Sequence, residues 1–302
     1  MNKKKLLSKI QKLYNEDNIN ITSYLKEIEK KEQNDIEDIL ISYDFQAGSY
    51  SKKYKEDPNS KKKHLSKLID ILNSKLQPIN SCLEVGVGEA TSMIEIIKSL
   101  NLNLKKIYGF DISWSRIKYA QKMIEEYGLE NTELFTADLF EMPFNDNSID
   151  LVYTIHALEP NGGKEVQAIK ELYRVSNKYV VLVEPCYEVA NEESKERMDK
   201  LGYVKGIREI IQTLGYTIII DEMLENDINP LNKAKIIVIE KESIQNVNYA
   251  LSCPLTKTPL VRLEGCYYSS ESLLAYPIIN VIPCLLSENA IVATKMLESE
   301  FC

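Results

Sequence analysis

Between residues 80 and 240, the chain alternates short apolar runs with longer stretches in which apolar residues recur every three or four positions. Short apolar runs are typical of buried strands, and the longer period is typical of amphipathic helices. The alternation predicts a mostly parallel sheet with helices on both faces. The predicted strands are 81–87, 106–110, 132–136, 149–155, 179–183, 216–221 and 234–240, and the predicted helices are 90–100, 115–127, 163–174 and 200–214.

The last two predicted strands are joined by 222–233, which has no helical pattern. Antiparallel neighbours can be joined without a helix, whereas parallel neighbours need a crossover connection. We therefore expect an α/β fold with a Rossmann-like, seven-stranded sheet that ends in an antiparallel hairpin. An ordinary dinucleotide-binding fold, whose strands all run parallel, lacks that hairpin.

Two further regions flank this pattern. The N-terminal region is charged and helix-favouring, and we expect it to form a helical lid. A polar linker, 241–248, precedes a C-terminal region rich in Leu, Ile, Pro and Tyr, which predicts a small, independent, β-rich domain. The predicted domains are 1–78, 79–243 and 249–302; within the first, helices are expected near 6–13, 36–41 and 62–76 and a loop at 42–58.

Composition narrows the class of partner. The chain has 302 residues, 44% of them hydrophobic and 27% charged, which fits a globular protein of more than one domain. Its net charge is −8, and it has 32 lysines but only 5 arginines. Because arginine is the usual residue for bidentate phosphate and base contacts, this balance argues against a nucleic-acid partner.

The six cysteines are widely spaced and form no CxxC pair, so the sequence indicates no metal site. The basic N-terminal stretch MNKKKLLSKIQKLYNED lacks the continuous apolar core of a signal peptide. No run approaches the roughly 18 apolar residues that a transmembrane helix needs. We expect a cytoplasmic protein with no membrane partner.

The motif LEVGVGEA, residues 83–90, stands where the first predicted strand meets a helix. Glycines at 86 and 88 allow a tight turn and a close approach of a ligand to the backbone, and small Ala90 allows the helix to pack near the strand. A tight turn without function is the alternative for this motif. A dinucleotide fingerprint would need Gly or Ala where Thr91 stands, and the Gly-Lys-Ser/Thr of a P-loop is absent.

Acidic residues follow the next two predicted strands. Asp111 is placed to accept hydrogen bonds from both hydroxyls of a ribose, and capping the following helix is its alternative role. Asp138 is placed to accept from an adenine amino group while Leu139 packs on the ring. Because the carboxyl ends of parallel strands share one edge of a sheet, these residues and the glycine motif should meet at one adenosyl ligand.

The segments SCLEVGVGEA, YGFDIS, TADLFEMPFNDNSIDLVYTIHALE and KELYRVSNKYVVLVEP resemble, in order and spacing, the motifs of class I S-adenosylmethionine-dependent methyltransferases. The nearest likeness is to the small-molecule branch that includes the ubiquinone/menaquinone-type enzymes. The resemblance implies S-adenosylmethionine as cofactor and an N-terminal Tyr-rich segment that closes over it. The cofactor-binding residues it implies are Tyr43, Gln46 and Tyr50 in that segment, Glu84, Gly86 and Gly88 at the methionine group, Asp111 and Ile112 at the ribose, Asp138 and Leu139 at the adenine, and Thr154 beside the methyl donor.

A sulfonium methyl is already activated, so the protein mainly aligns the acceptor and excludes water, and a base is needed only for a protonated acceptor. His156, after the fourth predicted strand, is the candidate base, with packing as its alternative role. Glu159 is a candidate to orient His156 or bind substrate, with a plain surface carboxylate as the alternative. Glu184 and Pro185 are candidates to line the acceptor pocket. The other polar candidates, His64 and the lysines at 61–63, are expected to face solvent.

The segments LSCPLTKTPL and YYSSESLLAYPIINVIPCLL resemble the small zinc-ribbon-like tRNA-methyltransferase activator family. A zinc-binding version would have a second cysteine near Thr256, and Cys266 and Cys284 fall outside ligand spacing. We therefore expect a module without metal, held by its apolar core. It either stabilises the chain or mediates contacts, for instance in a homodimer.

These observations favour methyl transfer to oxygen or nitrogen of a small metabolite, with a sugar or sugar precursor as one candidate. Methylation of tRNA or of a translation factor is the second reading, which the C-terminal resemblance suggests and the charge balance opposes. A non-catalytic, cofactor-binding subunit of another protein is the third.

Overall fold

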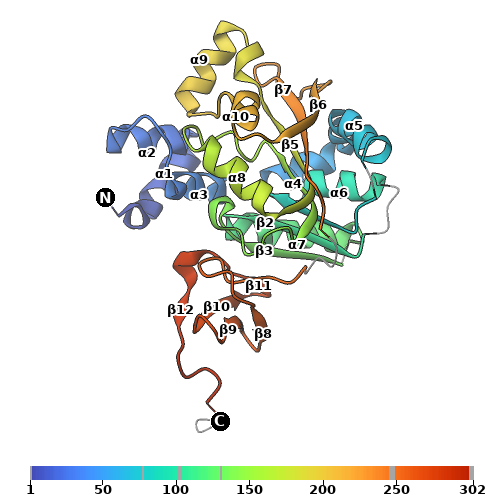
Figure 1. Cartoon of the computed structure of the whole chain (residues 1–302). Coiled ribbons are helices and arrows are strands. Elements are labelled where there is room, and N and C mark those ends of the chain that lie inside the picture. The colour runs from blue at the N-terminus through green and yellow to red at the C-terminus, as the bar shows by residue number, and fades with distance from the viewer. Residues whose placement is uncertain (1, 77, 101–103, 130, 245–248, 299–302) are drawn as a thin grey trace.

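The protein comprises a central sheet covered by helices, a group of N-terminal helices, and a small C-terminal sheet (Figure 1). The computed structural model describes residues 2–76, 78–100, 104–129, 131–244 and 249–298. The predicted linker 241–248 lies partly outside these residues, because 245–248 are not described. Within the described residues, no helix has the length and apolar character that crossing a membrane requires.

The central sheet has seven strands in the order β3-β2-β1-β4-β5-β7-β6. β7 runs antiparallel to both of its neighbours, while the β1–β2, β1–β4, β2–β3 and β4–β5 pairs are parallel. This confirms the predicted α/β sheet and its antiparallel hairpin. The strands are β1 (Ser81–Val85), β2 (Lys106–Asp111), β3 (Thr132–Thr136), β4 (Ile149–Ile155), β5 (Ser176–Pro185), β6 (Thr217–Met223) and β7 (Ala234–Glu240).

Apolar helix faces cover both sides of the sheet, as expected for strands whose side chains point alternately to each face. One side is packed by α5 (Pro58–Ser74), α6 (Thr91–Ser99) and α7 (Trp114–Glu126), the other by α8 (Glu165–Val175) and α10 (Ile207–Thr213). The single helix predicted at 200–214 is wrong. The chain instead forms α9 (Glu192–Leu201) and α10, because Gly202 and Gly206 adopt left-handed backbone conformations between them.

The N-terminal region is more helical than the sequence pattern predicted. It contains α1 (Leu7–Asp17), the unpredicted α2 (Ile21–Glu29), α3 (Ile36–Phe45) and α4 (Ser49–Glu56). The predicted loop at 42–58 is therefore wrong, since only a short turn at 46–48 and Asp57 separate α3, α4 and α5. Gly48 makes that turn with a φ of 95°, and its missing Cβ leaves room for the ring of Tyr119.

The C-terminal module is β-rich, as predicted, and lies against the β3 edge of the main sheet (Figure 1). Leu285 N–H donates to the carbonyl of Thr136 at 2.8 Å, which continues the strand pairing beyond β3. Tyr276 and Leu285 are fully buried in the same apolar cluster as Leu83 of β1. The module consists of β8 (Val261–Leu263), β9 (Cys266–Ser269), β10 (Leu274–Ile279), β11 (Ile282–Pro283) and β12 (Ile291–Val292).

Short 3-10 helices complete the chain. They are Lys3–Leu6, Leu139–Glu141, Tyr187–Val189 and Ser287–Asn289.

Candidate functional site

The glycine motif forms a tight turn between β1 and α6. Gly86 and Gly88 have φ values of +71° and +55°, which L side chains rarely adopt. A Cβ on Gly86 would lie 2.4 Å from the Cβ of Ala157, so no other residue fits there without movement. Ala90 also has a positive φ, 61°, at the N-cap of α6. The turn therefore brings bare backbone to the carboxyl end of the sheet.

Both predicted acidic residues lie at this edge. Asp111 ends β2, where its carboxylate accepts from the N–H of Gly88 at 3.0 Å and from the N–H of Ser113 at 2.9 Å. Ser113, not Asp111, is the N-cap of α7, so the alternative capping role for Asp111 is wrong. Asp138 accepts from the N–H of Phe140 at 2.9 Å. Burial raises the pKa of Asp111 and raises that of Asp138 to about 6.

Two adjacent cavities open at this edge. The smaller, about 100 Å³, is bounded by Asp111, Ile112, Asp138 and Leu139. The larger, about 420 Å³, takes in most of the other predicted residues, namely Tyr43, Gln46, Tyr50, Glu84, Gly86, Gly88, His156 and Glu159. Both cavities share Tyr43, Gly86, Arg116, His156 and Pro160, which mark their junction. Thr154 is fully buried in β4 and lines neither cavity.

Glu84 stands at the end of β1 beneath the larger cavity. Its carboxylate accepts from the hydroxyl of Tyr153 at 3.0 Å. Burial raises the pKa of Glu84 to about 8, although the Tyr153 hydrogen bond and the nearby Lys61 oppose that shift. The group is therefore largely protonated at neutral pH until a positive charge approaches it.

The lid residues Tyr43 and Tyr50 meet a residue that sequence reasoning missed. The Arg116 guanidinium lies 4.5 Å from the ring centroid of Tyr43 and 4.7 Å from that of Tyr50. Its Nε donates to the carbonyl of Tyr43 at 3.1 Å. Burial would lower the pKa of Arg116, but the combined electrostatic influence of Asp111, Tyr50, Tyr43 and Glu89 raises it overall. Arg116 thus joins the lid to the strand tip that carries Asp111.

Glu89 also ties the lid to the glycine motif, and sequence reasoning missed it too. Its buried carboxylate accepts from the backbone N–H groups of Gly48 (3.0 Å), Tyr50 (3.3 Å) and Ser51 (2.7 Å). These groups lie at the N-terminus of α4, where N–H groups have no partner inside the helix and negative charge is favoured. A residue of the glycine motif therefore caps α4, a helix of the segment predicted to form the lid.

A second helix cap is made by a residue of the N-terminal region, which caps a helix that packs on the main sheet. Asp44, in α3, accepts from the N–H of Ser115 at 3.1 Å and from its hydroxyl at 2.9 Å. It also accepts from the hydroxyl of Ser113 at 2.6 Å. The start of α7, next to Asp111, is therefore capped by the lid. Together with Glu89, this contact fixes the lid against the edge of the sheet.

His156 occupies the junction of the two cavities. It follows β4 with a φ of 56°, an unusual conformation for a non-glycine residue and one often found at functional sites. Its Nδ1 lies 3.2 Å from the Glu159 carboxylate, which also accepts from Tyr203 (3.2 Å) and Asn232 (3.1 Å). Since a carboxylate only accepts, Nδ1 carries the proton and Nε2 is free to take one. Burial would lower the pKa of His156, but the hydrogen bond and charge of Glu159, together with the charge of Glu184, raise it overall.

The expectation that His64 faces solvent is wrong. The side chain is buried in the larger cavity, with its ring stacked on that of His156 at a centroid distance of 5.9 Å. Nδ1 of His64 donates to the carbonyl of Asn226 at 3.0 Å, so Nε2 keeps its lone pair. Burial lowers the pKa of His64 to about 4, and the imidazole is neutral at physiological pH.

The same correction applies in part to the lysine run. Lys61 lines the larger cavity, where its Nζ donates to the Ser92 hydroxyl at 3.3 Å, while Lys62 is exposed. A signal for this existed in the sequence. Lys61 and His64 continue the stripe of the fully buried Leu65 and Leu68 at spacings of i, i+3, i+4 and i+7.

Glu184 and Pro185, predicted near the acceptor, instead line a separate cavity of about 220 Å³ on the other side of β5. Glu184 accepts from the N–H groups of Ala157 and Leu158, which fixes the turn after His156. Burial raises the pKa of Glu184 to about 7.

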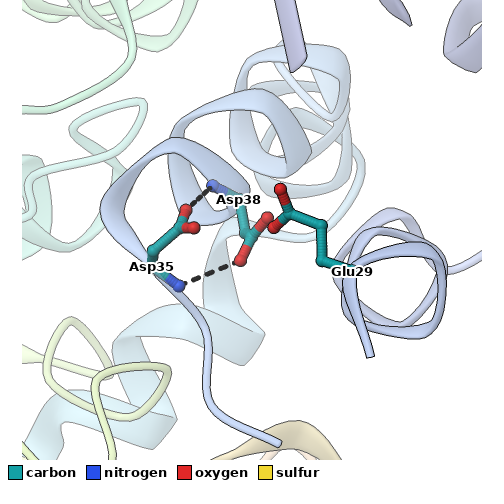
Figure 2. Close-up of side chains that lie close together, drawn as sticks. All are labelled: Glu29, Asp35 and Asp38. Carbon is teal, nitrogen blue, oxygen red and sulfur yellow. Dashed lines mark hydrogen bonds between the residues drawn. The ribbon is translucent and has the colours of Figure 1, made fainter. Parts of the chain in front are cut away.

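Three carboxylates cluster away from the cavities, at Glu29, Asp35 and Asp38 (Figure 2). Asp35 and Asp38 cap the start of α3 through reciprocal hydrogen bonds. The ammonium group of Lys31 lies 2.5–2.7 Å from all three carboxylates, and that of Lys3 lies 2.8 Å from Asp38 and 3.0 Å from Glu29. These cations occupy the position that a metal ion would take, so the cluster is an ion-pair network that joins α2 to α3.

The central part of this chain is similar in sequence to known proteins. A family model described as "Methyltransferase domain" matches residues 77–245. Ajmaline N-methyltransferase from Rauvolfia serpentina is 34% identical over 95 residues, 31% of each chain. Demethylmenaquinone methyltransferase from Geobacillus stearothermophilus is 28% identical over 116 residues, 38% of this chain and 49% of that one. The chain thus matches a third to a half of the length of these relatives.

Solved structures also align with this chain. Magnesium protoporphyrin IX methyltransferase from Synechocystis PCC 6803, with bound S-adenosylmethionine, aligns at a TM-score of 0.46 and 15% identity, over 78% of this chain and 96% of that one. The family match covers more than half of the chain and includes every strand of the main sheet. The chain belongs to the family of S-adenosylmethionine-dependent methyltransferase domains.

Proposed function

We propose that this protein transfers the methyl group of S-adenosylmethionine to an oxygen or nitrogen atom of a small, polar metabolite. The observation that carries the proposal is the junction of the two cavities at His156. The smaller cavity has the residues that suit an adenosyl group, and the larger one has room for the methionine group and an acceptor. The reactive sulfonium would lie between them.

The residues present fit the cofactor. Asp111, with a carboxylate at the tip of β2, would accept from the ribose hydroxyls, and Asp138 with Leu139 would hold the adenine. The turn at Gly86 and Gly88 leaves space that a Cβ would fill, which suits the methionine group. The cofactor supplies an activated methyl group, so the protein has to bind, orient and exclude water.

His156 would take the proton of the acceptor. Its Nε2 is the free nitrogen, because Nδ1 is held by Glu159. Glu159 fixes the tautomer and stabilises the imidazolium that forms when a proton arrives. Neighbouring His64, neutral and with a free Nε2, would accept a hydrogen bond from an O–H or N–H of the acceptor.

The lining of the larger cavity supports a polar acceptor. Apart from Ile155, Pro160, Leu201 and Ile228, the residues outside the glycine motif are polar, charged or carry a hydroxyl. Buried polar groups need hydrogen-bonding partners, so such a lining favours ligands with hydroxyl, amine or carboxylate groups over sterols and prenylated quinones. Sugars and their precursors are within this class. The likeness to demethylmenaquinone methyltransferase does not require a lipophilic substrate here.

The first test is calorimetry with S-adenosylmethionine and S-adenosylhomocysteine, followed by a radiolabelled methyl-transfer screen. Polar metabolites, a prenylated quinone precursor and bulk tRNA would be compared in one screen. We expect micromolar cofactor binding and transfer only to polar metabolites. Failure to bind either cofactor at millimolar concentration contradicts the proposal. Transfer to tRNA would support the second reading, and binding without any transfer would support a non-catalytic subunit.

We further propose the division of labour predicted from the sequence. Residues 1–78 act as the lid, 79–243 bind the cofactor, and 249–302 stabilise the β3 edge. Self-association through the last region stays a prediction, which light scattering of the purified chain would test.

A further inference from the structure

Lys61 is a cation that lines the larger cavity. It lies outside the family match, which begins at residue 77. It projects from the lid helix α5, and its Nζ donates to the hydroxyl of Ser92 in the first turn of α6. Among the residues that the structure describes, no carboxylate lies within salt-bridge distance of this Nζ. The same cavity contains the bare backbone at Gly86 and Gly88.

An unpaired ammonium in such a place is costly. Burial lowers the pKa of Lys61, with Glu84 as the main opposing influence. Glu84 is a weak counter-ion, because its own pKa is raised to about 8 by burial. Lys61 is half-buried, and a partly buried charge without a full partner carries a desolvation cost that a ligand anion beside Nζ would offset. The missing partner of Lys61 is an anion.

S-adenosylmethionine, the ligand proposed for this cavity, carries such an anion. It ends in an amino-acid group, with one carboxylate and one ammonium. The cavity presents the matching pair, since Lys61 with the Ser92 hydroxyl suits a carboxylate and Glu84 suits an ammonium. Lys53 also lines the cavity but is exposed, so it gains less from a counter-ion.

We propose that Lys61 binds the α-carboxylate of the cofactor's methionine group and thereby links the lid helix α5 to the bound cofactor. This inference rests on the proposed function, because it assumes an adenosyl ligand in the adjacent cavities. Lys61 is a binding residue in this proposal, and methyl transfer itself requires nothing further from it. The lid would then recognise the amino-acid end of the cofactor while the strand tips recognise the adenosine end.

The test compares two ligands that differ in the amino-acid group. S-adenosylhomocysteine carries it, and 5′-methylthioadenosine does not. Calorimetry on the full chain would measure both for wild type, Lys61→Met and the matched control Lys62→Met, an exposed lysine on the same helix. We expect Lys61→Met to weaken S-adenosylhomocysteine by about 10- to 100-fold, the usual effect of losing a charged hydrogen bond. The affinity for 5′-methylthioadenosine should stay within about twofold, and Lys62→Met should change neither.

Each other outcome overturns the inference. Equal weakening of both ligands would indicate a structural role for Lys61 through Ser92. An unchanged affinity for S-adenosylhomocysteine would assign Lys61 to the acceptor or to no ligand. If wild type binds neither compound, the proposed function fails as well, which separates the two failures. Ligand-free Lys61→Met should unfold at the same or a higher urea concentration than wild type, and Lys61→Gln gives the same comparison if the methionine variant does not fold.

Discussion

Glu89 provides the sharpest test of how the lid is held. Its carboxylate is 2% exposed and accepts from three backbone N–H groups at the start of α4, at Gly48, Tyr50 and Ser51. Glu89→Ala leaves those groups without an acceptor. Each unsatisfied buried N–H costs about 1–3 kcal/mol, and part of the helix end can move toward water. We therefore expect a loss of about 2–4 kcal/mol in the free energy of unfolding.

The chain offers a control on the same helix. Lys55 of α4 pairs with Glu126 of α7, but their side chains are 39% and 45% exposed. Because exposed ion pairs contribute little, Glu126→Ala should cost less than about 1 kcal/mol. Urea unfolding would be followed by far-UV circular dichroism and by the fluorescence of Trp114, the only tryptophan, at the start of α7.

Hydrogen exchange then locates the effect. In the Glu89→Ala protein, amides of α4 should exchange faster than in wild type, while those of the β1 strand change only with global stability. The reasoning is refuted if Glu89→Ala and Glu126→Ala lose the same stability within about 0.5 kcal/mol, or if α4 is no less protected than before.

Three further predictions concern the site. Gly86→Ala should weaken S-adenosylhomocysteine at least about tenfold in calorimetry, because of its positive φ and the contact with Ala157, and adding Ala157→Gly should restore only part of the affinity. His64 has a pKa of about 4, below the unfolded value near 6.5, so its stability contribution is complete above pH 6.5 and is lost as the pH falls toward 4. His64→Gln should remove about 3 kcal/mol of that acid destabilisation in urea titrations, and an unchanged slope would contradict the assignment. If His156 is the base, the rate of methyl transfer should rise as the pH passes through the pKa of His156. Glu159 raises that pKa, so Glu159→Gln should move the rise to lower pH. A pH–rate profile that does not move would exclude His156 as the base.

Much of the fold was accessible from the sequence because it depends on local periodicity. Strand β4 was predicted with its observed bounds, and the antiparallel hairpin followed from the missing helix at 222–233. The predictions that failed did so where contacts from distant parts of the chain outweigh the preference of the local sequence. The stretch 42–58 has Gly48, Pro58 and many polar residues, which favour a loop, yet its helices are capped by Glu89 and contacted by Arg116 from the sheet edge. Such partners are invisible to a pattern read within one segment.

The meeting of Asp111 and Asp138 at one cavity was also predictable, because parallel strands bring their carboxyl ends to one edge of the sheet. Both residues needed only the correct strand ends to be placed there. Thr154 lines neither cavity, since alternate residues of β4 face opposite sides of the sheet. A strand end identifies the edge, and the register decides which side chain reaches the cavity.

The part of the larger cavity that α5 lines was not predictable in the same way. Lys61 and His64 lie on the stripe that Leu65 and Leu68 bury against the sheet, so the helix has a polar and an apolar part on one face. A charged residue next to an apolar stripe is ordinarily read as the solvent boundary of an amphipathic helix. Here the boundary faces a cavity, since Lys61 and His64 both line the larger cavity. Polar residues that extend a buried apolar stripe are therefore the positions to examine for ligand contacts, and Lys61 is the one whose loss should distinguish a cofactor with an amino-acid group from one without it.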